Sequence, residues 1–121
     1  MKLLTQELIN TLPGPRAQEN VEDPIVYAKF FHPLSGWVWY VTEAWNAIVD
    51  ANGDFVEERK LSEPLKDGEK IEYVMFFGFV VGVESEFGNF SLNELQSIQK
   101  PLPIERDLHF KPTKLSILEP T

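Results

Sequence analysis

The sequence predicts an α+β fold, an antiparallel sheet of four to five strands with two short helices packed on one face. Two segments, residues 27–45 and 73–90, hold most of the aromatic side chains and are rich in β-branched residues, a composition typical of strands. Capping signals mark two short helices, and an Asn-Gly pair marks a hairpin. A chain of 121 residues is long enough for one core, so we expect a single domain over residues 1–121.

The first helix is expected to begin after Thr5. Thr5 is a favourable N-cap residue, and Leu4 and Ile9 have the spacing of a hydrophobic staple. Residues 13–15 read Pro-Gly-Pro and end the helix. Residues 16–24 are polar and are predicted to form a loop.

Two strands are expected next, over residues 25–32 and 37–45, with a turn at residues 33–36. Side chains alternate between the faces of a strand, so one face of the second strand should be strongly aromatic and belong to the core. The residues expected on that face are Trp37, Trp39, Val41, Glu43 and Trp45.

Asn52-Gly53 separates two short segments with strand character. This pair readily takes the two positive φ angles of a type I′ turn, so the sequence predicts a hairpin here. Half of the formal net charge of −8 falls in residues 46–72. We interpret this segment as an acidic hairpin and loop insertion.

Residues 71–83 are the most hydrophobic part of the chain and are predicted to form the central strand. Gly78 and Gly82 interrupt this strand. Glycine inside a strand indicates a bulge or a large neighbour that lies close to the backbone.

The second helix is the clearest local prediction. Ser91 and Glu94 have the spacing of a capping box, Phe90 and Leu95 form a staple, and Pro101 ends the segment. Residues 103–112 alternate as an extended segment. Their apolar-rich face would carry Ile104, Arg106, Leu108 and Phe110. Residues 113–121 are expected to be a partly ordered tail.

Composition excludes several chemistries. The chain has no cysteine, so it has no disulfide, catalytic thiolate, iron–sulfur cluster or cysteine-ligated zinc. We expect neither a metal nor a cofactor. The negative charge disfavours direct non-specific binding of nucleic acid. Gln6 and Glu7 interrupt the first apolar run, and the longest apolar segment is about half a membrane span, so we expect a soluble cytoplasmic protein.

Few residues suggest catalysis. The two histidines, His32 and His109, would form an acid–base pair if the fold brought them together near Arg106 or Lys111. Asp107 lies two residues before His109 and would orient its ring on a regular strand. The sequence favours the plainer interpretation, an edge strand carrying charges that prevent strand pairing.

Other polar groups also have structural explanations. Residues 50–54 resemble a calcium loop, but the positions that require Gly and Glu hold Phe55 and Leu61. Glu84 and Glu86 would form a carboxylate cluster with Glu94, which already has a capping role. The aromatic residues are assigned to the core, except Trp45, which we expect to be exposed at an interface beside the acidic hairpin.

Several segments resemble a bacterial family known only as a domain of unknown function, DUF2958. The matching segments are residues 20–21, 23–27, 29–31, 37–43, 76–82, 88–95 and 103–112. The last of these, Pro-Ile-Glu-Arg-Asp-Leu-His-Phe-Lys-Pro, is the most specific, whereas residues 45–72 depart most from the family. The resemblance implies a small intracellular protein carried on plasmids and integrative elements. It assigns no activity and no catalytic residue.

These observations favour a non-enzymatic module that binds another protein through an acidic surface. The candidate binding residues are Glu105, Arg106, Asp107, His109, Lys111 and Trp45. A second hypothesis is a small hydrolase or nuclease that uses Asp107 and His109, with His32 as a further candidate. A third is a nucleic-acid-binding accessory protein, which requires Lys29, Arg106, Lys111 and Lys114 to converge on one patch.

Overall fold

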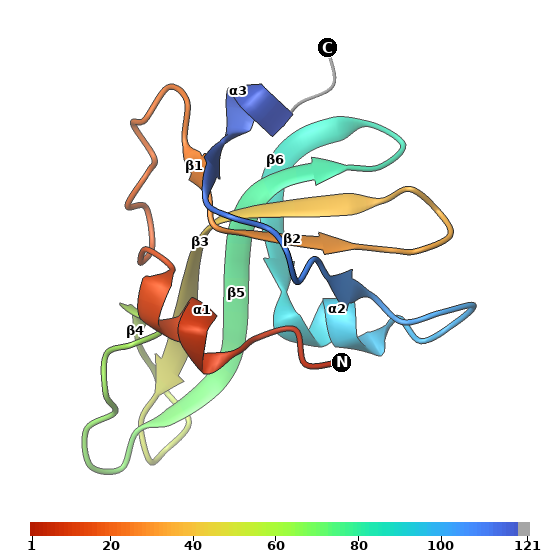
Figure 1. Ribbon diagram of the computed structural model, residues 1–121. Coiled ribbons are helices and arrows are strands. Elements are labelled where there is room, and N and C mark those ends of the chain that lie inside the picture. The colour runs from red at the N-terminus through yellow and green to blue at the C-terminus, as the bar shows by residue number, and fades with distance from the viewer. Residues whose placement is uncertain (119–121) are drawn as a thin grey trace.

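The computed structural model describes residues 1–118 and has an antiparallel sheet of six strands at its centre (Figure 1). The strands of this sheet are β2 (Ala28–Phe31), β3 (Val38–Val49), β4 (Phe55–Lys60), β5 (Lys70–Val81), β6 (Ser85–Ser91) and β7 (Glu105–Arg106). Their order is β6-β5-β3-β2-β7, and β4 pairs with β3 beside this path. A separate ribbon joins β1 (Ile25–Val26) to β8 (Thr113–Lys114). The α+β class is confirmed, but the predicted sheet of four to five strands was too small.

Strand β3 is the centre of the sheet. It pairs with β5 along one edge, while its other edge pairs first with β2 and then with β4. Every residue of β3 after Val38 is buried, whereas the first four residues of β5 are exposed. The prediction that residues 71–83 form the central strand is therefore wrong. The second half of β3 lies between two strands and is better shielded from solvent than the first residues of β5.

A β-bulge at Thr42 divides β3 into two parts. Val41 pairs with Gly78 and Glu43 with Phe77, so Thr42 is an extra residue in the ladder. An extra residue reverses the alternation of faces beyond it. Trp39, Val41 and Ala44 accordingly belong to the main core, whereas Glu43 and Trp45 line a cleft on the other face. The prediction of one face from Trp37 to Trp45 is wrong for this reason.

Gly78 in β5 and Gly82, directly after this strand, have the close neighbours that the sequence predicted. A Cβ atom on Gly78 would lie 1.8 Å from the carbonyl oxygen of Tyr40, directly beside the bulge. A Cβ atom on Gly82 would lie 2.5 Å from the ring of Trp37. Gly78 faces rigid backbone, so this position admits no side chain without a change in the sheet.

Helices α1 (Gln6–Thr11) and α2 (Leu92–Ser97) both pack against the main core, as predicted, and both lie in the lower half of Figure 1. The Thr5 hydroxyl accepts the Leu8 N–H at 3.3 Å. At α2 the Ser91 hydroxyl accepts the Glu94 N–H, and the Glu94 carboxylate accepts the Ser91 N–H, so the capping box is complete. The core beneath the helices includes Phe30, Phe76 and Phe90.

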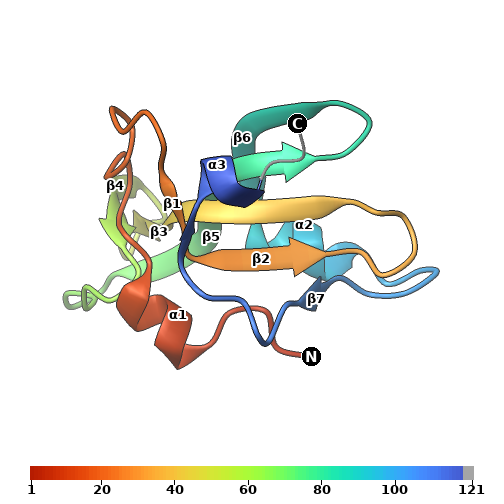
Figure 2. The same ribbon diagram turned by 45° about the horizontal axis from the view of Figure 1, so that its top comes forward.

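The opposite face carries a second apolar cluster, to which residues 115 and 118 of the expected tail (residues 113–121) contribute. Helix α3 (Leu115–Leu118) follows β8 (Figure 2). Its Leu115 belongs to this cluster together with Val26 and Tyr40. The Asp23 carboxylate accepts hydrogen bonds from the N–H and hydroxyl of Ser116, and these bonds lower the pKa of Asp23. Residues 119–121 of the predicted tail lie outside the described residues.

Local turn chemistry departs from the sequence prediction at the hairpin. The hairpin is present, but its backbone turns over residues 50–53 and only Gly53, with φ of +85°, has a positive φ there. The Asp50 carboxylate accepts the N–H groups of Asn52 and Asp54 and so organises the loop. The predicted type I′ turn is therefore wrong, because the Asp50 side chain stabilises a longer turn.

The extended segment predicted over residues 103–112 is also shorter than expected. Only Glu105 and Arg106 pair with β2, because the Asp107 carboxylate accepts the N–H of His109 and turns the chain.

Strand β6 was not predicted. Its Gly88 and Asn89 are residue types that are depleted in strands, and they obscured the pattern.

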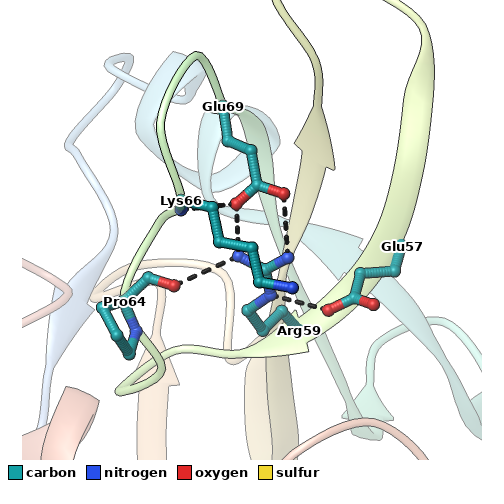
Figure 3. A network of polar contacts seen from close by, with 5 residues as sticks. All are labelled: Glu57, Arg59, Pro64, Lys66 and Glu69. Carbon is teal, nitrogen blue, oxygen red and sulfur yellow. Dashed lines mark hydrogen bonds and ion pairs between the residues drawn. The ribbon is translucent and has the colours of Figure 1, made fainter.

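Hydrogen bonds from Arg59 on strand β4 hold the loop at residues 61–69 against this strand (Figure 3). Its guanidinium donates to both carboxylate oxygens of Glu69, at 2.7 and 3.1 Å, to Glu57 at 2.6 Å and to the carbonyl of Pro64 at 3.1 Å. Glu69 also accepts the Lys66 N–H. The hydrogen bonds from Arg59 contribute most to lowering the pKa of Glu69 to about 2. Part of the acidity of residues 46–72 is thus neutralised within the fold.

The contact at Gly78 predicts the cost of a side chain there. Gly78→Ala should destabilise the protein by about 2–3 kcal/mol, because the new methyl group overlaps the Tyr40 carbonyl. Gly88→Ala is the matched control, since Gly88 is the partner of Gly78 on β6 and has open space around its Cα. Its effect should stay within about 0.5 kcal/mol in urea unfolding. Equal effects of the two substitutions would show that the close approach is not the constraint.

The Arg59–Glu69 pair predicts an acid-dependent loss of stability. The pKa of Glu69 is about 2 in the fold and has an ordinary value of 4.5, so the pair stabilises the protein fully above pH 4.5. This contribution should disappear as the pH falls from 4.5 to about 2. Glu69→Gln should therefore be less stable than the parent at neutral pH, and the difference should shrink with acidification. Glu63→Gln, in the same loop, serves as the control in unfolding curves measured across this range.

Candidate functional site

A cleft of about 500 Å³ lies on the face of the sheet opposite α1 and α2. Strands β3, β5 and β6 supply its floor and one wall, and the loop of residues 16–24 supplies the other. The lining residues are Arg16, Gln18, Glu19, Val21, Glu22, Pro24, Thr42, Glu43, Trp45, Glu58, Phe77, Phe87 and Asn89.

The loop is held across a gap in the pairing of β3. Strands β2 and β4 occupy the two ends of the same edge of β3 and leave its middle uncovered. The side-chain amide of Gln18 fills part of this gap, donating to the carbonyls of Ile25 and Thr42 at 2.8 and 2.9 Å and accepting the Ile25 N–H at 2.8 Å. The Ala44 N–H donates to Pro13 O at 3.0 Å. Gln18 therefore replaces a strand partner and fixes the loop over the cleft.

Glu43 is the buried charged group of the cleft. Only 4% of its surface is exposed. Its Oε2 accepts the backbone N–H of Gln18 at 2.8 Å. Burial raises the pKa of Glu43, and hydrogen bonds from the backbone of Gln18 and Arg16 offset this only in part. The bulge at Thr42 is what turns this carboxylate away from the main core.

Aromatic rings form the apolar wall of the cleft. The rings of Phe77 and Phe87 stack with centroids 6.0 Å apart, and Phe79 meets Phe87 edge-on at 5.1 Å. Trp45 is only 7% exposed and lines the cleft from β3. The expectation that Trp45 is exposed is wrong, because the bulge places its ring under the loop rather than beside the hairpin.

The cleft is strongly acidic. Four carboxylates line it, those of Glu19, Glu22, Glu43 and Glu58, against the single guanidinium of Arg16. Arg16 forms an ion pair with Glu58 at 2.8 Å on the rim, and hydrogen bonding with Glu58 raises the pKa of Arg16. Among the described residues, no ion pair engages Glu19, Glu22 or Glu43, so the cleft keeps an excess of negative charge.

His32 does not lie in this cleft and has a structural role. Its side chain is buried, its Nδ1 accepts the Ser35 N–H at 3.0 Å, and its Nε2 lies 3.1 Å from the carbonyl of Leu102. A neutral ring with the proton on Nε2 satisfies both contacts. Both ring nitrogens of His32 contact backbone groups, which is a structural role, and an acid–base pair of His32 and His109 stays a prediction.

Most of the other predicted site residues gather in a separate shallow hollow of about 360 Å³, lined by Glu105, Arg106, Asp107 and His109, with Lys29 beside them. One Asp107 oxygen accepts the backbone N–H of His109, and the other lies 4.0 Å from the Lys29 ammonium. Within the described residues, no hydrogen bond joins this carboxylate to the imidazole of His109. Lys111 and Lys114 do not line this hollow, so the predicted basic patch does not assemble there.

The remaining candidates do not form a metal site. Within residues 1–118, no group of three or more Asp, Glu or His side chains is arranged to hold a metal ion. The Asp50 carboxylate accepts backbone N–H groups, and the Glu94 carboxylate belongs to the capping box.

No described helix is both long and apolar enough to cross a membrane.

Sequence reasoning missed Glu43 and Gln18 as site residues. Glu43 is the one charged residue in the otherwise apolar or neutral run of residues 37–49, which was the available signal. Gln18 lies in a polar loop and gave no comparable signal, since its role depends on the gap beside β3.

The comparisons with known proteins agree with part of the resemblance seen in the sequence. Residues 69–118 match the model of a family described as "Protein of unknown function (DUF2958)". No curated protein and no solved structure matched the chain. The matched segment runs from β5 to α3 and includes Phe77, Phe87 and Asn89 of the cleft, but neither Glu43 nor the loop above it. These findings support a DUF2958-like domain in this chain, with residues 69–118 as its matched part.

Proposed function

We propose that this protein is a non-enzymatic interaction module whose cleft holds a basic side chain of a partner protein. The observation that carries the proposal is the buried carboxylate of Glu43 at the base of an aromatic, acidic cleft. The proposal keeps the acidic surface expected from the sequence but assigns binding to this cleft, whereas the sequence assigned it, apart from Trp45, to residues 105–111.

The chemistry of the cleft suits an arginine or lysine side chain. Such a side chain has an apolar stem and a charged end, and the cleft offers apolar rings near a carboxylate. A cation over the faces of Trp45 or Phe77 would gain cation–π attraction, and the end group would pair with Glu43. A volume of about 500 Å³ is ample for one such side chain.

The energetics of Glu43 also support a cationic ligand. Burial penalises the charged form of this carboxylate, and in the described structure its partner is a backbone N–H rather than a cation. A ligand cation would compensate the buried charge. A buried acid with a raised pKa that lines a cleft is a candidate functional group.

The rim favours a macromolecular partner. Glu19 and Glu22 are exposed and would attract a basic segment before it docks, as would the net charge of −8. In the plasmid or integrative-element setting that the family resemblance implies, such a module would cover a basic surface on a host or defence protein.

The direct test is a titration with N-acetyl-arginine amide, followed by NMR shifts of the tryptophan side chains. The compound should bind the parent protein weakly, and Glu43→Gln should lower the affinity by about tenfold or more, because a charged hydrogen bond is lost. Glu72→Gln, an exposed site outside the cleft lining, is the control and should leave the affinity unchanged. Absence of binding, or equal binding by both variants, would refute the proposal.

The same substitution should have the opposite effect on stability. Gln at position 43 keeps an oxygen for the Gln18 N–H but carries no charge, so the free energy of unfolding at neutral pH should be unchanged or higher. Since the raised pKa of Glu43 favours its neutral form in the fold, the parent should approach the variant as the pH falls through that pKa. A clear loss of stability at neutral pH would show that the charge serves the fold instead.

Binding should also depend on pH. A cation binds the ionised form of Glu43, so the affinity should fall as acidification protonates this group. The decline should begin above the ordinary range of a glutamate, because burial raises the pKa of Glu43. Isothermal titration calorimetry across this range, with Glu43→Gln as a pH-insensitive reference, checks the expectation.

A further inference from the structure

We propose that the basic segment of the partner adds to the sheet as an extra strand along the outer edge of β6. This inference rests on the proposed function and deepens it, because it states how the partner docks. The interaction would combine backbone hydrogen bonds at the edge with side chains that reach the cleft.

Strand β6 has an edge available for pairing. It ends the order of the six-stranded sheet, and its ladder joins it to β5 alone. Throughout residues 1–118, no strand or loop backbone bonds to the other side of residues 85–90. Ser85, Glu86, Phe87 and Asn89 are all exposed, so this edge is open to a second chain.

The same edge borders the cleft. Phe87 and Asn89 are alternate residues of β6, and both line the cleft that contains Glu43. A strand paired with β6 would direct alternate side chains over the same face, beside the Phe87 ring. On that face, these side chains would lie over the wall of the cleft that Phe87 and Asn89 form.

The remaining side chains of an added strand would meet further acids. A hollow of about 400 Å³ at the end of β6 is lined by Glu84 and Glu86, together with Trp37 and Val83. Val83 is 92% exposed, so this region also offers apolar surface. A segment that alternates basic and apolar residues would match both faces of the edge.

The acidic residues at β6 favour a basic strand of a partner over a second copy of this chain. Natural edge strands are often protected by lysine or proline, whereas β6 contains neither. It carries Glu86, with Glu84 just before it, and each copy of the chain has a net charge of −8, so like charge opposes the pairing of two copies. A basic strand is attracted by the same acids.

The test uses a blocked hexapeptide that alternates arginine and valine, with N-acetyl-arginine amide as the reference compound. The hexapeptide should bind about tenfold more tightly than the amide, because it adds edge hydrogen bonds. Two backbone-methylated forms, carrying the methyl groups on the odd or on the even residues, keep the charges and remove alternate N–H donors. One form should lose the gain in affinity and the other should keep it, since alternate N–H groups of a strand point to opposite sides.

Protein variants supply a second readout. Glu86→Lys should weaken hexapeptide binding about tenfold and leave binding of the amide unchanged, because Glu86 lies outside the cleft lining. Glu72→Lys is the matched control for added charge. Backbone amides within residues 85–89 should exchange hydrogen more slowly when the hexapeptide is bound.

The outcomes separate the two proposals. If both methylated forms bind as tightly as the parent hexapeptide, strand addition is wrong, while Glu43-dependent binding of the amide would still support the proposed function. If neither the amide nor the hexapeptide binds, the proposed function fails and this inference fails with it. A dimer of the free protein in sedimentation that Glu86→Lys alters would show that β6 pairs with a second copy instead.

Discussion

The close approach of Gly78 to the backbone of Tyr40 is the constraint on which the candidate site depends. At this point the sheet accommodates one extra residue, Thr42, and the side chains of β3 change faces. A regular strand would have kept Glu43 and Trp45 on the same face as Trp39, inside the main core. A charged carboxylate there would carry a large desolvation cost without a solvent-accessible partner. The bulge therefore makes a glutamate in the central strand compatible with a stable core, and it places the Glu43 carboxylate in the cleft.

The loop over the cleft follows from the same strand. Because β2 and β4 share one edge of β3, the middle of that edge would expose unpaired backbone groups. Residues 13–25 supply the missing partners through Pro13 and through the side chain of Gln18. Since Gln18 donates its backbone N–H to Glu43, the segment that completes the sheet also positions the buried acid. Stability and site geometry are therefore coupled in this region.

The negative charge of the chain has several distinct roles. In the segment of residues 46–72, Glu57 and Glu69 pair with Arg59, and Glu58 pairs with Arg16. Asp50 organises a turn through backbone N–H groups. These acids serve local structure, although this segment holds half of the net charge. The carboxylates around the aromatic cleft come mainly from the loop of residues 16–24 and from β3, which is where unpaired negative charge and apolar surface coincide.

Local signals in the sequence determined the parts of the protein that depend on neighbouring residues. Both helix caps at Thr5 and Ser91, the position of the hairpin, the α+β class and the need for small residues at Gly78 and Gly82 follow from short-range chemistry or strand composition. The motif at residues 103–112 and its neighbours also indicated the family resemblance that the match over residues 69–118 supports. Tertiary structure decided the rest. A bulge depends on the register between β3 and β5, which are separated in the chain by a hairpin and a long loop, so the alternation read from one strand assigned Glu43 and Trp45 to the wrong face. The same non-local pairing left the gap that Gln18 fills and the free edge of β6. The sequence of one strand does not show which of its backbone groups stay unpaired, because that depends on how all the strands pair in the folded sheet.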